Sequence, residues 1–138
     1  MTEGIVGGAK LGPSLLEFVM VGFRQLKVWE KSHQLTLAAY RVTSAFPRDE
    51  RYGISSQLRR SAASISANIA EGCGHRSKRE FARFLTIALG SASEFEYHLL
   101  LAFDLGLVEA GDYQLLEANV TEAKRMLTGF IKKLMSDV

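Results

Sequence analysis

The sequence has little cysteine and proline, with one Cys and two Pro among 138 residues. A single thiol can supply neither an intrachain disulfide nor a zinc site that needs two or more thiolates, and it fits a reducing cytoplasm. A chain of this length can bury about 68% of its unfolded surface, so its stability requires neither a disulfide nor a structural metal. We therefore expect a single globular domain located in the cytoplasm.

Long hydrophobic runs are also lacking. The only apolar stretch among the first 22 residues, Leu15 to Val21, is interrupted by Glu17 and is far shorter than the roughly 20 residues that span a bilayer. Lys10 is the only cation before Arg24, so the basic start of a signal peptide is missing. We expect no membrane insertion and no export. Residues 1–22 are predicted to be a flexible extension that precedes a domain at 23–138, with Met20 as a candidate natural start.

Catalytic and cofactor motifs are missing as well. Neither a Walker loop nor a dinucleotide-binding fingerprint occurs. Di-iron bundles carry Glu-x-x-His pairs on two helices, whereas this chain has one such pair, Glu30 and His33. Cys73 and His75 would point about 200° apart on a helix, so Cys73 is better interpreted as a small core residue. The sequence predicts no enzymatic activity, no cofactor and no metal.

Apolar residues recur every three or four positions from Val28 onward, which indicates amphipathic helices. Pro47 ends the first helical segment, and Ser77 with Glu80 forms a capping box at the start of the third. Gly106 is placed as the C-terminal cap of that third segment. The pattern predicts an all-α, antiparallel up-down-up-down four-helix bundle with helices at about 27–45, 52–73, 77–105 and 110–135.

Two of these predicted helices carry apolar or small residues on a second side. This second set comprises Ala63, Ala67, Ile87, Tyr97 and Leu101. Left exposed, these side chains would form a patch larger than soluble monomers usually tolerate. We therefore predict a homo-oligomer with these residues at the interface. The alternative is that the small residues merely favour helix formation.

A polar stripe runs between the two apolar sides of the segment 52–73. It consists of Gln57, Arg60, Ser64, Asn68, Glu71 and His75. One interpretation is a buried structural network of Gln57, Arg60, Asn68 and Glu71 that fixes helix register. A binding groove and ordinary solvent exposure are the alternatives.

Charge is distributed unevenly along the chain. Residues 23–83 contain 12 Lys or Arg against 5 Asp or Glu, while residues 84–138 contain 4 against 8. Such asymmetry favours a partner that carries phosphates, or contact between basic and acidic patches of neighbouring subunits.

The basic residues gather at the start of the third predicted helix. Arg76, Arg79 and Arg83 follow steps of three and four, away from the core stripe. Cations at a helix N-terminus oppose the macrodipole, at a cost of about 0.3–1 kcal/mol each, whereas a phosphate would be well placed there. The predicted nucleic-acid-binding residues are Arg76, Lys78, Arg79 and Arg83, extended by Arg59, Lys27 and Lys31. A solvated basic turn is the alternative.

A distinctive run occupies the second segment: Gln57-Leu58-Arg59-Arg60-Ser61-Ala62-Ala63-Ser64-Ile65, followed by Asn68-Ile69-Ala70-Glu71-Gly72. It resembles the signature of a bacterial family of four-helix bundles, the 23S rRNA intervening sequence proteins. Flanking pieces agree with that family, namely Leu26-Lys27-Val28-Trp29, Phe46-Pro47 and Phe84-Leu85. The resemblance covers roughly residues 23–134.

The resemblance implies a cytoplasmic helical bundle with no established catalytic activity. The accessory protein of diversity-generating retroelements is similar in fold; it is pentameric, binds nucleic acid and contacts a reverse transcriptase. By this resemblance, we expect the chain to form a homo-oligomer, specifically a pentamer, with a basic surface. Two function classes remain open: a protein that binds RNA or DNA through phosphate-backbone contacts with little sequence preference, or an oligomeric adaptor that docks an acidic partner such as a reverse transcriptase.

Overall fold

The computed structural model describes residues 22–136. This part of the chain contains no strand and forms the short 3-10 helices η1 (Phe23–Gln25) and η2 (Arg48–Glu50) together with four long helices. The long helices are α2 (Lys27–Thr43), α3 (Ile54–Cys73), α4 (Lys78–Asp104) and α5 (Ala110–Ser136). The predicted all-α class is confirmed. Residues 1–21, which include Met20, lie outside the described range.

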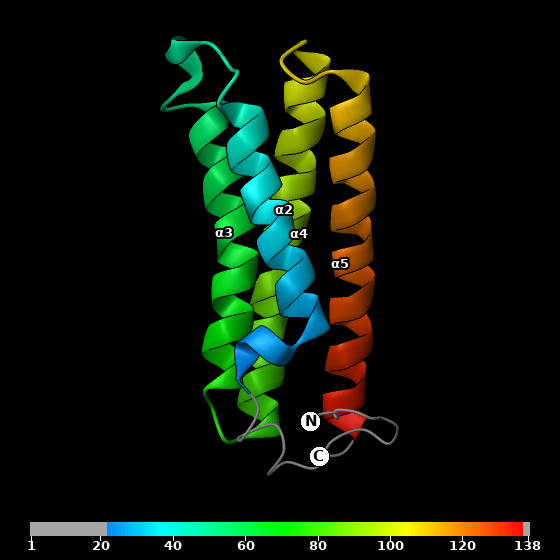
Figure 1. The fold of residues 1–138 in the computed structure, drawn as a ribbon. Coiled ribbons are helices and arrows are strands. Elements are labelled where there is room, and N and C mark those ends of the chain that lie inside the picture. The colour runs from blue at the N-terminus through cyan, green and yellow to red at the C-terminus, as the bar shows by residue number, and fades with distance from the viewer. Residues whose placement is uncertain (1–21, 137–138) are drawn as a thin grey trace.

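The four long helices lie side by side as a bundle (Figure 1). Helices α3 and α5 each pack against both α2 and α4. The α2–α3 and α4–α5 connections lie at one end of the bundle and the α3–α4 turn lies at the other, as Figure 1 shows. Residues on the α3–α4 turn and on the α2–α3 connection are therefore separated by the length of the bundle.

The helix ends follow the capping signals in the sequence. The Ser77 hydroxyl accepts the backbone N–H of Glu80 at 3.2 Å, which begins α4. Gly106 has a φ of +78°, and its N–H reaches Phe103 O at 3.0 Å while Leu107 N–H reaches Ala102 O at 2.9 Å. These bonds form a Schellman motif, which requires a left-handed residue at position 106.

Two predicted boundaries need correction. Helix α2 ends at Thr43 and not at 45, and α3 begins at Ile54 and not at 52. Pro47 has no N–H to continue a helix, and the chain between the helices forms η2 before Gly53 starts α3. The α2–α3 connection is consequently longer and more structured than the apolar spacing indicated.

One apolar stripe from each long helix meets the others in the core. The largest side chains buried there come from all four long helices, and they include Leu35, Leu58, Ile65, Ile69, Phe81, Leu85, Phe95, Leu99, Leu116, Leu127 and Leu134. Between α2 and α3 the packing includes hydroxyl groups. Thr36 Oγ1 donates to Ser32 O at 2.9 Å and is 3.1 Å from Ala62 O of α3, so short polar side chains are buried there with their hydrogen bonds satisfied.

Candidate functional site

The α3–α4 turn carries the basic cluster that the sequence predicts as a phosphate contact. Arg76 lies in the turn, Arg79 and Arg83 lie one turn apart on α4, and all three side chains are exposed. Ser77 fixes their position because it caps the first turn of α4. Three guanidinium groups are thus held beside the N-terminus of a 27-residue helix.

Arg83 is already engaged by its own helix. Its Nε donates to the two carboxylate oxygens of Glu80 at 3.2 and 3.3 Å, and its Nη2 donates to Glu80 Oε1 at 3.1 Å. The guanidinium also lies 4.6 Å from the centre of the Phe84 ring. The hydrogen bond from Arg83 lowers the pKa of Glu80, so the carboxylate stays ionised near neutral pH. Arg83 is therefore a weaker candidate for a phosphate contact than its spacing indicates.

Arg76 and Arg79 differ from Arg83 because Glu80 pairs with Arg83 and not with them. Neither forms an ion pair with any residue between 22 and 136. The Lys78 side chain, between them in the sequence, is half-buried. His75 stacks on the Phe84 ring with centroids 4.9 Å apart, which covers one side of that aromatic. Arg76 and Arg79 are consequently the two cations of the turn best able to bind an external anion.

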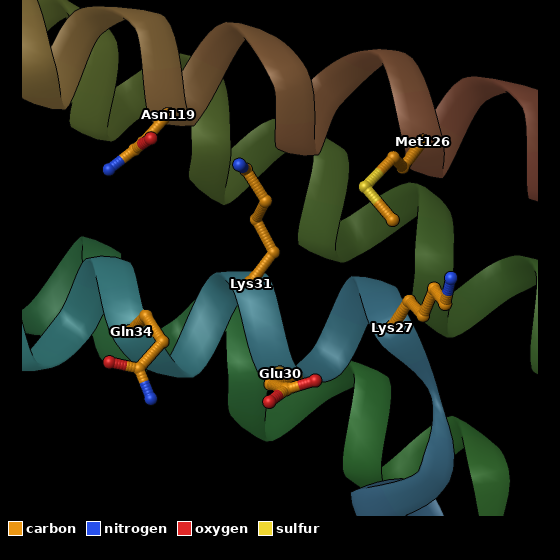
Figure 2. A pocket seen from close by; sticks show the side chains of 6 residues that line it. All are labelled: Lys27, Glu30, Lys31, Gln34, Asn119 and Met126. Carbon is orange, nitrogen blue, oxygen red and sulfur yellow. The ribbon is translucent and has the colours of Figure 1, made fainter.

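Lys27 and Lys31 lie on a different side of the molecule. They border a hollow of about 410 Å³ between α2 and α5, together with Glu30, Gln34, Asn119 and Met126. Figure 2 shows Lys31 of α2 and Met126 of α5 extending into the space between the two helices. These lysines therefore belong to an α2–α5 hollow and do not continue the arginine face of α4.

Arg59 does not extend the cluster either. It lies 14 residues before the end of α3, which is about 21 Å along the helix axis. Its Nε donates to Thr43 Oγ1 at 2.7 Å, and its guanidinium stacks over Tyr40 at 4.6 Å from the ring centre. Within one chain Arg59 is therefore separated from Arg76, and only assembly of several chains could bring the two into one patch.

The polar stripe of α3 forms two groups of hydrogen bonds, each of which reaches α4. Arg60 Nη2 donates to Glu94 Oε2 at 2.7 Å and also bonds Gln57, while the Arg60 and Glu94 side chains are 57% and 38% exposed. Asn68 Nδ2 donates to Ser64 O at 2.8 Å, and the Ser64 hydroxyl lies 2.8 Å from that of Ser91 on α4. The pairing of Arg60 with a neighbouring helix was expected and is present, but the Arg60–Glu94 pair is exposed at the surface and not buried.

Glu71, the fourth predicted member of the network, belongs to neither group. Its side chain is exposed and forms no hydrogen bond or ion pair with another described residue. It lies on the solvent side of α3, where hydration replaces a protein partner. The stripe therefore forms two separate groups, Gln57 and Arg60 with Glu94, and Asn68 with Ser64 and Ser91.

The predicted second apolar side is only partly exposed. Ile87 and Tyr97 are 41% and 59% exposed on α4, Ala67 is exposed on α3, and Ala63 is half-buried. Leu101, by contrast, packs against the core cluster. The exposed part of the predicted set is therefore smaller than the sequence indicated, and it comprises Ala67, Ile87 and Tyr97.

Cys73 is buried, and burial raises the pKa of its thiol, so the thiolate that a nucleophile needs is disfavoured. Residues 22–136 hold no group of three His, Cys, Asp or Glu side chains arranged for a metal ion. None of the helices in that range combines the length and apolar character that crossing a bilayer requires.

A hollow that the sequence did not predict lies at the end of the bundle opposite the α3–α4 turn. Arg48, Arg51 and Arg59 border it. The cations themselves are visible in the sequence, but Arg48 and Arg51 lie on the α2–α3 connection while Arg59 lies on α3. Only the packing of the α2–α3 connection against both helices brings them together.

Comparison with known proteins agrees with this architecture. A crystal structure from Bacteroides thetaiotaomicron, of a protein with unknown function from the S23 ribosomal protein family, is similar with a TM-score of 0.70. That protein is 29% identical in sequence, and the match covers 76% of this chain and 95% of the other. No curated protein matches the chain. The family model of the 23S rRNA-intervening sequence protein matches residues 24–129, and the chain therefore belongs to that family.

Proposed function

We propose that the protein is a non-enzymatic, cytoplasmic homo-oligomer that binds RNA or DNA through phosphate-backbone contacts at the α3–α4 turn. The observation that carries the proposal is the pair Arg76 and Arg79, exposed and without an ion pair among the described residues. Helix stability does not account for these cations, because positive charge at the N-terminus of α4 opposes its macrodipole. A phosphate would accept hydrogen bonds from both guanidinium groups and from the first N–H groups of α4.

The chemistry of the turn favours backbone contacts over base recognition. Tyr40, Tyr52 and Tyr97, the large aromatics that are exposed in the described chain, all lie outside the turn. Phe84 beside it is buried and is covered by Arg83 and His75. With no aromatic surface for stacking among the cations, the site is expected to show little sequence preference.

Assembly would bring several copies of this turn onto one particle. Four helices in up-down-up-down order leave Ala67, Ile87 and Tyr97 on the outer side of α3 and α4, and a second copy would cover them. The resemblance to the accessory protein of diversity-generating retroelements favours a pentamer. Repeated weak phosphate contacts would then add through avidity.

An adaptor that docks an acidic protein is the alternative, and the α2–α5 hollow favours it. Lys27 and Lys31 stand beside Met126 there, which combines positive charge with an adaptable apolar side chain. An acidic helix, such as one from a reverse transcriptase, would fit this chemistry. Binding at this hollow does not need Arg76 or Arg79.

Titration of labelled RNA and DNA of unrelated sequences, followed by fluorescence anisotropy, tests the proposal. The parent protein is expected to bind all of them with similar affinity, and the double variant Arg76→Ala/Arg79→Ala to bind all of them more weakly. Arg41→Ala is the matched control, since Arg41 is exposed on α2 and lies near the other end of the bundle. No binding by the parent at low salt would reject the proposal and favour the adaptor.

A further inference from the structure

Three arginines border one hollow at the end of the bundle that carries the α2–α3 connection. The hollow has a volume of about 260 Å³, and Arg48, Arg51 and Arg59 line it together with Thr43, Ser44 and Ser55. No Asp or Glu of the described chain lines it. Three arginines and three hydroxyl-bearing residues thus line one small space, together with Phe46 and Pro47.

Arg59 is held in a fixed orientation at this hollow. Its Nε donates to Thr43 Oγ1 at 2.7 Å and its Nη2 reaches Tyr40 O at 3.4 Å, while the Tyr40 ring covers one face of the guanidinium. The Nη1 group bonds no residue in the range 22–136. A guanidinium held in place in this way loses little side-chain entropy when it binds an anion.

Ser55 offers this space an unpaired hydroxyl. The residue is only 6% exposed and lines the hollow, and its hydroxyl has no hydrogen-bond partner within the described chain. That hydroxyl is not fully enclosed, since the fully buried side-chain atom without a partner among residues 22–136 is His98 Nδ1, so a ligand in the hollow can reach it. Ser55 also lies in the first turn of α3, whose N-cap Gly53 supplies no side-chain cap, so the first N–H groups of a 20-residue helix end beside the same space.

The nearby carboxylates offset the charge of these arginines only in part. Asp49 and Glu50 lie on η2 but do not line the hollow, and neither forms an ion pair in the described part of the chain. If Gly53 carried a Cβ atom, that atom would lie 3.3 Å from Glu50 Oε1. The Glu50 carboxylate therefore lies beside the start of α3. Two carboxylates near three guanidinium groups leave the hollow positively charged.

We propose that this hollow binds a phosphate group, either free or at the end of a nucleotide. Guanidinium forks match phosphate oxygens in pairs, and the Ser55 hydroxyl with the first N–H groups of α3 would complete the hydrogen bonds. The space is below the range of about 300–1,000 Å³ typical of larger ligands. Tyr52, which follows Arg51, is 89% exposed and offers a surface on which a nucleobase can stack.

Titration of the full chain with inorganic phosphate, followed by NMR, tests the proposal directly. The amide resonances of Ser55 and Ser56 are expected to shift and saturate. Arg48→Gln and Arg51→Gln, at exposed positions, are each expected to weaken phosphate binding about tenfold or more. Arg76→Gln/Arg79→Gln is the control, and it should leave these shifts unchanged. This control also separates the hollow from the proposed nucleic-acid contact, which can fail while phosphate still binds here.

A second experiment distinguishes free phosphate from the phosphate group of a nucleotide. If the phosphate belongs to a nucleotide, a nucleoside monophosphate binds more tightly than inorganic phosphate, and Tyr52→Ala removes that difference. If it is free, the two bind alike and Tyr52→Ala changes neither. Absence of a saturable shift in the parent protein, or saturation that persists unchanged in Arg48→Gln/Arg51→Gln, overturns the proposal.

Discussion

At position 72 only a glycine leaves room for α4 to lie against α3. A Cβ on Gly72 would come within 2.7 Å of Phe84 Cβ and 3.0 Å of Phe81 Cδ1. Both aromatics are buried, so the contact is with side chains that have little space to move. The small residue thereby sets the separation of the two helices that end at the basic turn.

Gly72→Ala is expected to destabilise the protein. Overpacking costs about 1–3 kcal/mol, which exceeds the roughly 0.8–1.0 kcal/mol that alanine gains over glycine inside a helix. Gly129→Ala on α5 is the matched control, because a Cβ there meets nothing within 4 Å, and it should stabilise. Urea denaturation measures both. A Gly72→Ala variant as stable as Gly129→Ala would show that the interhelical contact is looser than described.

Glu80 pairs with Arg83 on the same helix. The pKa of Glu80 is lower in the folded protein than its ordinary value, so the stabilisation from its pair with Arg83 is present above the ordinary value and is lost as pH falls through the lowered one. Near neutral pH the pair is therefore intact, and Arg83 is held by Glu80.

Replacing Glu80 by Gln should release Arg83 and strengthen nucleic-acid binding. One additional phosphate contact is expected to steepen the slope of log K against log salt by about 0.7–0.9. Glu122→Gln is the control, because it removes the same charge from another Glu–Arg pair three residues apart, with Arg125 on α5. Equal gains in the two variants would mean that net charge, and not Arg83, is responsible.

At the scale of elements, α3 and α4 pack against each other. An exposed ion pair lies at the edge of their contact. Arg60 and Glu94 meet at 2.7 Å but keep 57% and 38% of their side chains exposed. Exposed pairs of this kind contribute little because water and salt screen them. The apolar contacts around Gly72, and not the polar stripe, are expected to hold the two helices.

A double-mutant cycle with Arg60→Ala and Glu94→Ala tests that expectation. The coupling energy should be about 0.2–1 kcal/mol, the range measured for exposed pairs. Denaturation of the parent, the two single variants and the double variant supplies it. A coupling well above this range would support the buried-network interpretation of the stripe instead.

The sequence predicts a feature of the fold well where the residues that determine it are close together in the chain. Ser77 and Gly106 mark the ends of α4 because capping is decided within a few residues, and the core stripes follow from helical periodicity. Arg59 and Arg76 share the basic character of the same segment, yet the bundle places them near opposite ends. The hollow at Arg48 and Arg51 depends on how the α2–α3 connection folds against α3, which periodicity does not reveal.

At the scale of the whole molecule, the exposed side of α3 and α4 predicts self-association. Light scattering at micromolar concentration should give a multiple of the 15.3 kDa chain mass. Introducing charge with Ile87→Glu/Tyr97→Glu should return the protein to the monomer while it stays helical, since a buried carboxylate is strongly disfavoured at an interface.

Leu115→Glu is the control for association. Leu115 is 54% exposed but lies on α5, away from the proposed contact. A monomeric parent, or equal loss of mass in both variants, would contradict an interface at Ile87 and Tyr97.

The central claim is that Arg76 and Arg79 contact nucleic-acid phosphates. The most direct test is the salt dependence of binding to an unrelated single-stranded RNA, measured for the parent and for Arg76→Ala/Arg79→Ala. Each lost contact should flatten the slope of log K against log salt by about 0.7, while helicity is retained and affinity falls alike for all sequences. An unchanged slope and affinity in the double variant would contradict the account.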